Sequence, residues 1–176
     1  MKELKRDCVI GTLFVIITGT LSHFVYDWSG QNYIAGFFFP VDESTWEHMK
    51  LCFFPMLVYS LYLIKKPKDT QTCISSSLAG GILTGTFAIP LLFYTYTGIL
   101  GKSFPPLDIG VFIVSVVLAF YTVYRLSLSC RAECHTMLLW TAVTVLILCF
   151  IWFTYHSPGI GIFTVGLITL LLKPCT

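Results

Sequence analysis

The chain has 176 residues, of which 56% are hydrophobic and only 11% are Asp, Glu, Lys or Arg. A soluble domain normally carries about 25% charged residues. Because the deficit extends along the whole chain, the composition excludes an ordinary soluble domain. The net charge is only +2 and there is no basic stripe, so we expect no nucleic-acid partner. The lipid bilayer is the predicted partner.

Five apolar runs approach the roughly 20 residues that a helix needs to cross the hydrocarbon core of a bilayer. The predicted helices cover residues 8–28, 44–64, 74–97, 107–126 and 137–155. A last run, 160–172, is shorter and fits a re-entrant, an interfacial or a sixth, thinned transmembrane segment. Because the linkers are short, we expect one all-α domain over residues 1–176, a polytopic transmembrane helix bundle.

Basic residues predict the orientation, because Lys and Arg concentrate in the cytoplasmic loops of multi-pass proteins. Eight of them fall on one side of the predicted bundle: Lys2, Lys5, Arg6, Lys65, Lys66, Lys68, Arg125 and Arg131. The other side has only Lys50 and Lys102, and Lys173 is not assigned to a side because the last apolar run is ambiguous. Tryptophans agree with this reading, since an aromatic belt is expected at each boundary: Trp28, Trp46 and Trp152 outside, Trp140 inside. We therefore expect a multi-pass protein of the cell membrane with a cytoplasmic N-terminus.

With this topology, ionisable residues gather at the outer end of the bundle. They are His23, Asp27, Asp42, Glu43, Glu47, His48, Asp108 and His156. Ionisable residues in membrane segments are costly and tend to mark functional sites. Several helices and one loop supply them, so packing could bring them together. The candidate substrate-binding residues are His23, Asp27, Asn32, Trp46, Lys50, Asp108 and His156.

Glu43 and Glu47 are four residues apart, a spacing at which like charges on a helix repel. Lys50, a histidine, a proton or a metal ion must offset this repulsion. A purely structural alternative also exists. Ser44 and Glu47 match the Ser-x-x-Glu capping box, in which both side chains satisfy free backbone amides at a helix start.

Histidines and carboxylates at one end of a bundle are the ligand types that zinc prefers. The candidate metal ligands are His23, His48, His156 and Glu47. Zinc held by three protein ligands would leave a position for water, although the chain lacks a His-Glu-x-x-His motif. Without a metal, Glu47, His48 and Glu43 are the candidate acid/base catalysts. Asp27 lies four residues after His23 on the same helix face, and pairing between these two is the structural alternative.

A second group lies on the predicted cytoplasmic side, where Cys130, Cys134 and His135 follow the fourth helix and Cys8 and Cys73 lie at helix ends. The Cys-x-x-x-Cys-His spacing could bind a metal ion but matches no established motif. In a reducing compartment we expect these cysteines to be structural thiols.

Small residues and prolines mark two further features of the predicted helices. Gly80, Gly81 and Gly85 supply a Gly-x-x-x-Gly step, which predicts close helix packing. Pro55 and Pro90 interrupt the second and third helices. Such prolines usually kink a membrane helix and less often open a binding cavity.

One block of the chain resembles a family of small bacterial integral membrane proteins of unknown function. The block reads Phe39-Pro40-Val41-Asp42-Glu43-Ser44-Thr45-Trp46-Glu47-His48-Met49-Lys50, with Ser29-Gly30-Gln31-Asn32 before it and Phe53-Phe54-Pro55 after it. The family usually has Asn-Glu-Ser-x-Trp-Glu-His-x-Lys, so Asp42 replaces an asparagine and remains compatible with a capping role. The resemblance covers the first two helices well and the remainder mainly in hydropathy. It implies a membrane location and a focal motif but no reaction.

Three functions are compatible with these observations. The first is a membrane-embedded enzyme acting on a lipid or lipid-linked substrate, with Glu47 or Glu43 as acid/base. The second is a small transporter or solute-binding subunit with broken helices at Pro55 and Pro90. The third is a non-catalytic assembly or sensor protein. Because the chain shows no inverted repeat and its polar residues lie at one end, the sequence favours the enzyme over the transporter.

Overall fold

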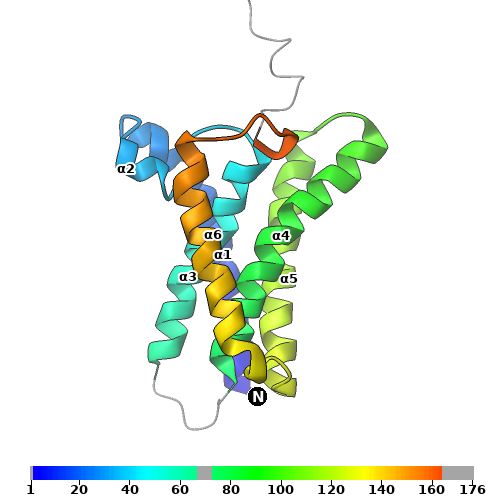
Figure 1. Ribbon diagram of the computed structural model, residues 1–176. Helices are drawn as coiled ribbons and strands as arrows, with labels where there is room; N and C mark the ends of the chain where they lie inside the picture. The colour runs from blue at the N-terminus through cyan, green and yellow to red at the C-terminus, as the bar shows by residue number, and fades with distance from the viewer. Residues whose placement is uncertain (1, 67–72, 164–176) are drawn as a thin grey trace, which may run out of the picture.

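The computed structural model describes residues 2–66 and 73–163, and this part of the chain is helical without any strand. The elements are α1 (Lys2–Trp28), α2 (Tyr33–Gly36), α3 (Thr45–Lys65), α4 (Ile74–Leu100), α5 (Pro105–Ser129), η1 (Glu133–His135), α6 (Thr136–Tyr155) and η2 (Gly161–Phe163). The five long helices run up and down between two ends (Figure 1). We call these the N-terminal end, where α1 begins, and the α2 end.

Four helical segments among the described residues are long and apolar enough to cross a membrane. They are Lys2–Trp28, Ile74–Leu100, Pro105–Ser129 and Glu133–Tyr155. Helix α3, which was also predicted as a span, is not in this set. Helices α1 and α4 extend beyond their predicted limits of 8 and 97. Hydropathy detects only the apolar part of a helix, so the polar turns at the helix ends were not predicted.

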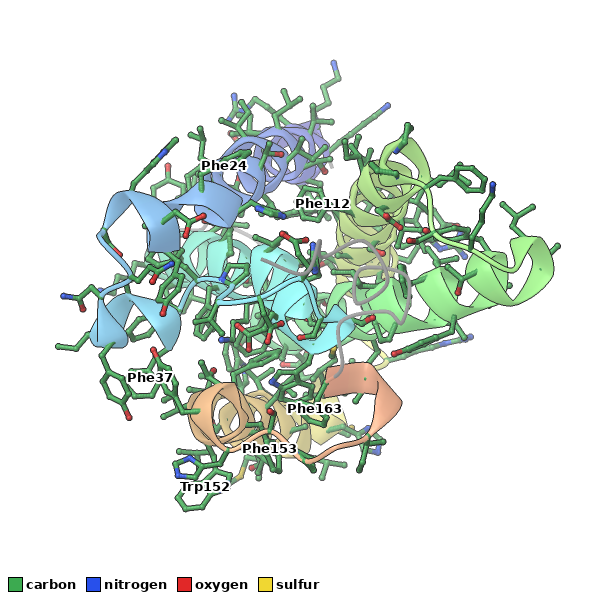
Figure 2. All side chains as sticks on the ribbon, turned by 90° about the horizontal axis from the view of Figure 1, so that it is seen from above. Phe24, Phe37, Phe112, Trp152, Phe153 and Phe163 are labelled. Atoms are coloured by element: carbon green, nitrogen blue, oxygen red, sulfur yellow. A yellow bond between two sulfur atoms is a disulfide. The ribbon has the colours of Figure 1, made fainter. Side chains whose placement is uncertain are left out.

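Helix α3 occupies the centre of the bundle, with α1, α4, α5 and α6 around it (Figure 2). Most of its side chains are buried. The chain continues as an α-helix through Pro55 in α3 and Pro90 in α4. The central helix therefore runs unbroken between the two ends and carries its charged first turns into the α2 end.

The glycines of α4 allow close contact with α5, which confirms the predicted packing role. A Cβ atom added at Gly81 would lie 2.8 Å from the carbonyl oxygen of Ala119. One added at Gly85 would lie 2.7 Å from the Cβ atom of Ala119. Since the missing side chains let the two backbones approach, α4 and α5 pack closely at these positions.

Glycines also position α1 against the rest of the bundle. A side chain at Gly11 would collide with the rings of Tyr59 and Phe120. At Gly19 an added Cβ would lie 2.6 Å from the ring of Phe112, which extends from α5 toward α1 (Figure 2). These contacts fix the rotation of α1, and thereby the direction of His23 one turn later.

Trp46 is buried inside the bundle and does not project outward as the predicted aromatic belt requires. It is only 8% exposed, with ring centroids 4.8 Å from Phe150 of α6 and 4.8 Å from Phe163 of η2. By contrast, Trp152 is 62% exposed and points away from the bundle (Figure 2). The apolar stretch 160–172 begins with η2 and otherwise lies outside the described residues.

The expectation of reduced thiols fails for two cysteines. Cys73 and Cys130 form a disulfide with a Cα–Cα distance of 5.3 Å. Cys73 precedes α4 and Cys130 follows α5. Because these two helices are antiparallel, the start of one meets the end of the other at the N-terminal end, although 57 positions separate the cysteines in sequence. Cys8, Cys52, Cys134 and Cys149 are free.

Candidate functional site

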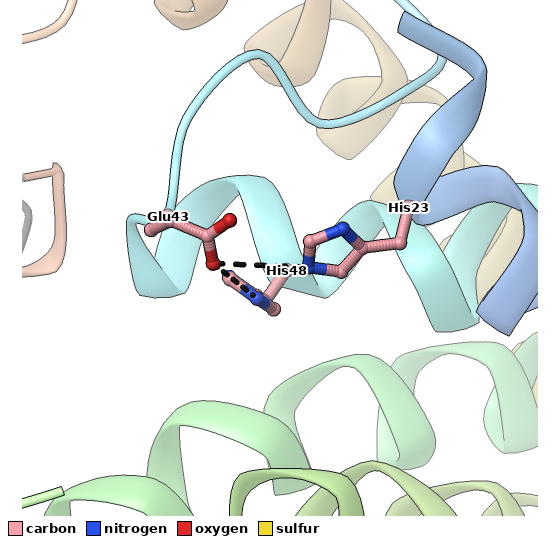
Figure 3. Close-up of side chains that lie close together, drawn as sticks. All are labelled: His23, Glu43 and His48. Carbon is pink, nitrogen blue, oxygen red and sulfur yellow. Dashed lines mark ion pairs between the residues drawn. The ribbon is translucent and has the colours of Figure 1, made fainter. Parts of the chain in front are cut away.

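Two histidines and a glutamate converge at the α2 end, and we call His23, Glu43 and His48 the histidine cluster (Figure 3). His23 comes from the last part of α1, Glu43 from the loop before α3 and His48 from the start of α3. The Oε2 atom of Glu43 lies 3.4 Å from Nε2 of His48 and 3.7 Å from Nε2 of His23. One carboxylate oxygen therefore faces two imidazole nitrogens.

The loop before α3 is built by local hydrogen bonds that hold Glu43 in position. The Asp42 carboxylate accepts from the Ser44 amide at 2.8 Å. The Ser44 hydroxyl accepts from the Glu47 amide at 3.3 Å and caps α3. The serine half of the predicted capping box is thus confirmed, whereas Asp42 bonds to the amide of the capping residue itself and to no amide of α3. The other half is wrong, because the Glu47 carboxylate accepts from the Val41 amide at 3.0 Å instead.

The hydrogen bonding of His48 fixes which of its nitrogens faces the cluster as an acceptor. Its Nδ1 atom lies 2.9 Å from the carbonyl oxygen of Ser44. A carbonyl oxygen only accepts, so Nδ1 must carry the proton. In the neutral imidazole Nε2 then presents a lone pair toward the Glu43 carboxylate, which is also an acceptor. A proton on Nε2 or a metal ion between the two atoms would make this contact attractive.

The separations within the histidine cluster suit a metal ion. With zinc–ligand bonds of about 2.0–2.1 Å, tetrahedral ligands lie about 3.3–3.4 Å apart. The ligand atoms of the cluster all lie within 4.8 Å of one another, and two of their separations are 3.4 and 3.7 Å. Small side-chain movements would close the set around one ion. Two histidines and one carboxylate make three protein ligands, the number typical of catalytic zinc.

The charge balance of the cluster favours ionised Glu43. The imidazoles of His23 and then His48 hold the pKa of the Glu43 carboxyl well below its usual range. Asp108, in the first turn of α5, adds a second negative charge that acts on His48. Asp108 in turn accepts a hydrogen bond from the Tyr96 hydroxyl at the end of α4. The surroundings of the cluster thus favour a cation.

Glu47, predicted as a metal ligand and an acid/base, is not in the histidine cluster. It is 2% exposed and its Oε2 atom lies 2.7 Å from Nζ of Lys50, which is 1% exposed. Lys50 also donates to the Gly36 carbonyl at 2.9 Å and to the Thr154 hydroxyl at 2.7 Å. Glu43 and Glu47 therefore have separate partners, which resolves their expected repulsion. Glu47 and Lys50 join α2, α3 and α6.

The model of one protein family matches residues 1–169 of the chain. The chain belongs to this family, described as "Family of unknown function (DUF6512)". No curated protein and no solved structure matches. The predicted membership of a family without an assigned function is thereby confirmed, while the bacterial source and the family-specific block stay predictions.

The remaining predicted site residues of this DUF6512 member lie elsewhere. His156 is exposed and stacks on Trp152 with 4.8 Å between the ring centroids, so it does not complete the metal set. Asp27 is exposed, and His23 turns toward Glu43 instead of pairing with it. Asn32 caps α2, its side-chain oxygen accepting from the Ile34 amide at 2.9 Å. Trp46 is part of the core.

The sequence of this DUF6512 member did not predict the roles of two residues at the α2 end, Thr154 and Tyr96. Thr154 accepts from Lys50 across 104 positions, and no local signal could have indicated it. Tyr96 is nearer, 12 positions before Asp108. An antiparallel pairing of the two predicted helices around Gly101 would have suggested this contact.

Proposed function

We propose that this chain is a membrane-embedded enzyme that binds a divalent metal ion, preferably zinc, through His23, Glu43 and His48. Its substrate would be a lipid or lipid-linked molecule. The observation that carries the proposal is the Nδ1 hydrogen bond of His48 to the Ser44 carbonyl, 2.9 Å long. Metal-binding histidines characteristically donate their other ring N–H to a backbone carbonyl or carboxylate, which orients the ring and directs the free lone pair at the ion.

We further propose that α3 is a fifth span and that the N-terminus is cytoplasmic in a bacterial cell membrane. In favour of the fifth span, α3 has 21 residues, near the spanning length, and lies among the apolar helices. Its two buried charges, on Glu47 and Lys50, neutralise each other. The distribution of Lys and Arg supports the orientation. On this topology the histidine cluster is at the extracytoplasmic end.

The chemistry of the site would be hydrolytic. A zinc ion with three protein ligands retains a position for water and lowers the pKa of that water toward 7. The sides of α1 and α5 away from the bundle carry exposed apolar residues such as Phe24 and Val114, and lipid contact there supports a substrate that arrives from the bilayer.

The transporter alternative has less support. A transporter site of the broken-helix type lies near the middle of the membrane. Here α3 and α4 continue through Pro55 and Pro90, and the histidine cluster lies at one end. These two observations favour a surface-facing site over a midplane site.

Metal content of the purified protein tests the metal site. The wild-type chain in lipid nanodiscs, loaded with zinc and washed, is expected to retain about one zinc per chain. His23→Ala and His48→Ala should lose it. His156→Ala is the matched control, since His156 is a histidine of the same end outside the cluster, and it should retain zinc. Equal zinc content in all four proteins would refute the metal site.

Product release tests the enzymatic role separately. Nanodiscs made from phosphatidylethanolamine and phosphatidylglycerol are incubated with the zinc-loaded protein, and released headgroups and fatty acids are measured by mass spectrometry. We expect release by the wild type and His156→Ala, and none by Glu43→Gln. Release that persists in Glu43→Gln would contradict a role of the cluster in catalysis, whatever the zinc content.

A further inference from the structure

A second group of reactive side chains lies at the N-terminal end, far along the bundle from the histidine cluster. It consists of Cys73 at the start of α4, Cys130 at the end of α5 and Glu133 in η1. The two cysteines form a disulfide, and Oε2 of Glu133 lies 2.7 Å from Sγ of Cys73. A carboxylate is thus in direct contact with one sulfur of a cysteine pair.

The contact with Glu133, observed here beside the disulfide, can become a hydrogen bond only when the pair is reduced. A sulfur atom in a disulfide has no proton, whereas a thiol donates one, so Cys73 hydrogen-bonds to the carboxylate only as a thiol. Nucleophilic attack requires the thiolate. Glu133 is therefore in position to take the proton from Cys73 as the disulfide forms, and to return it as the disulfide opens.

The two sulfurs differ in accessibility, which sets the order of reaction. Cys73 is buried, only 4% exposed, while Cys130 is exposed at the end of its helix. An external thiol or disulfide can reach Cys130 and not Cys73. On the topology proposed above, this end faces the cytoplasm, where disulfides are usually transient and serve catalysis or redox sensing.

We propose that Cys73, Cys130 and Glu133 form a thiol–disulfide exchange site whose reaction partners are low-molecular-weight thiols and disulfides. In the oxidative direction the Cys130 thiolate attacks an external disulfide, forming a mixed disulfide and releasing one thiol. Cys73 then loses its proton to Glu133, attacks the Cys130 sulfur and releases the second thiol. The balance is two protein thiols and one external disulfide giving one protein disulfide and two external thiols. Reduction follows the same steps in reverse.

Glutathione disulfide is a suitable probe for the test. The full-length protein in nanodiscs is reduced, freed of reductant and mixed with glutathione disulfide, and its cysteines are followed by alkylation and peptide mass spectrometry. The wild type is expected to form the Cys73–Cys130 disulfide with little glutathione on Cys130. In Glu133→Gln the second step should slow by about tenfold or more, the scale of lost general-base catalysis, so the mixed disulfide at Cys130 accumulates. Glu133→Asp should restore part of the rate.

Two internal controls accompany this test. Cys134 is free and exposed, so its glutathione adduct reports that the probe reaches this end. Glu3→Gln removes another exposed glutamate of the N-terminal end and should behave as the wild type. Disulfide formation in Glu133→Gln at the wild-type rate would overturn the role of Glu133. Cys73 and Cys130 remaining thiols while Cys134 reacts, or a folded-state disulfide that resists reduced glutathione, would overturn the exchange site itself.

Discussion

Lys50 and Glu47 form an ion pair inside the bundle, with 2.7 Å between Nζ and Oε2 and both side chains almost fully buried. Charges withdrawn from solvent need partners, and here each charge is the partner of the other. Removal of either charged group alone should therefore lower the stability of the protein far more than replacement of both together.

Replacement of Lys50 is expected to destabilise the protein strongly. Lys50→Met leaves the Glu47 carboxylate buried without its cation and should lower the free energy of unfolding by about 3–5 kcal/mol. Denaturant titration in detergent micelles measures this change. Lys102→Met removes an exposed lysine and should change the free energy by less than about 0.5 kcal/mol.

The double variant Glu47→Gln/Lys50→Met distinguishes the effect of charge pairing from the effect of side-chain packing. Because it removes both buried charges, it should recover most of the stability lost by Lys50→Met. A double variant as unstable as the single one would show that packing of the lysine stem, and not charge pairing, is the source of the effect.

Substitution of Ser44 distinguishes helix capping from metal binding. Ser44→Ala removes the hydroxyl that accepts from the Glu47 amide and should lower the free energy of unfolding by about 1 kcal/mol. The carbonyl that orients His48 belongs to the backbone and stays. Zinc content should therefore match the wild type. Loss of zinc from this variant would indicate that the cap itself holds the histidine cluster together.

Zinc binding is expected to weaken on acidification through the histidine range. Zinc requires neutral imidazoles, so protons compete with zinc for His23 and His48. The pKa of Glu43 is lowered by His23 and His48, so its carboxylate remains charged and does not limit binding over this interval. Isothermal titration between about pH 5.5 and 7.5 should give a dissociation constant that rises as pH falls. A constant independent of pH would contradict ligation by His23 and His48.

The contact between α4 and α5 predicts that alanine substitution at two glycines of α4 changes the stability of the protein differently. Gly81→Ala would bring a methyl group to 2.8 Å from the Ala119 carbonyl oxygen and should cost about 1–3 kcal/mol of stability. Gly98 has open space around it, so Gly98→Ala should be neutral or stabilising by up to about 1 kcal/mol. Thermal unfolding of both variants measures the contrast. Equal effects would mean that helix propensity, and not packing, governs both positions.

The sequence predicted those features that depend on nearby residues. Hydropathy located the long helices, and the spacing of Ser44 and Glu47 located the start of α3 with its serine cap. The small residues at Gly81 and Gly85 predicted close packing, because the absence of a side chain has the same consequence in any helix pair.

Features that depend on the rotation of a helix about its own axis could not be predicted from the sequence. His23 meets Glu43 because Gly11 and Gly19 bring α1 against other helices at one particular rotation, and a single chain gives no measure of that angle. For the same reason Glu47 was grouped with the histidines. Its buried partner Lys50 lies on the opposite side of the first turn from His48, and only packing decides which side faces the core.

The hydrogen bonds of Lys50 also bear on the order in which the chain assembles during synthesis. Two of its acceptors, Glu47 and the Gly36 carbonyl, are nearby in sequence, whereas the third is Thr154 in α6. Until α6 has been synthesised and inserted, one N–H of this ammonium group has no protein acceptor. During synthesis this third acceptor becomes available only after α6 has formed, so the burial of Lys50 depends on a segment made about a hundred positions later.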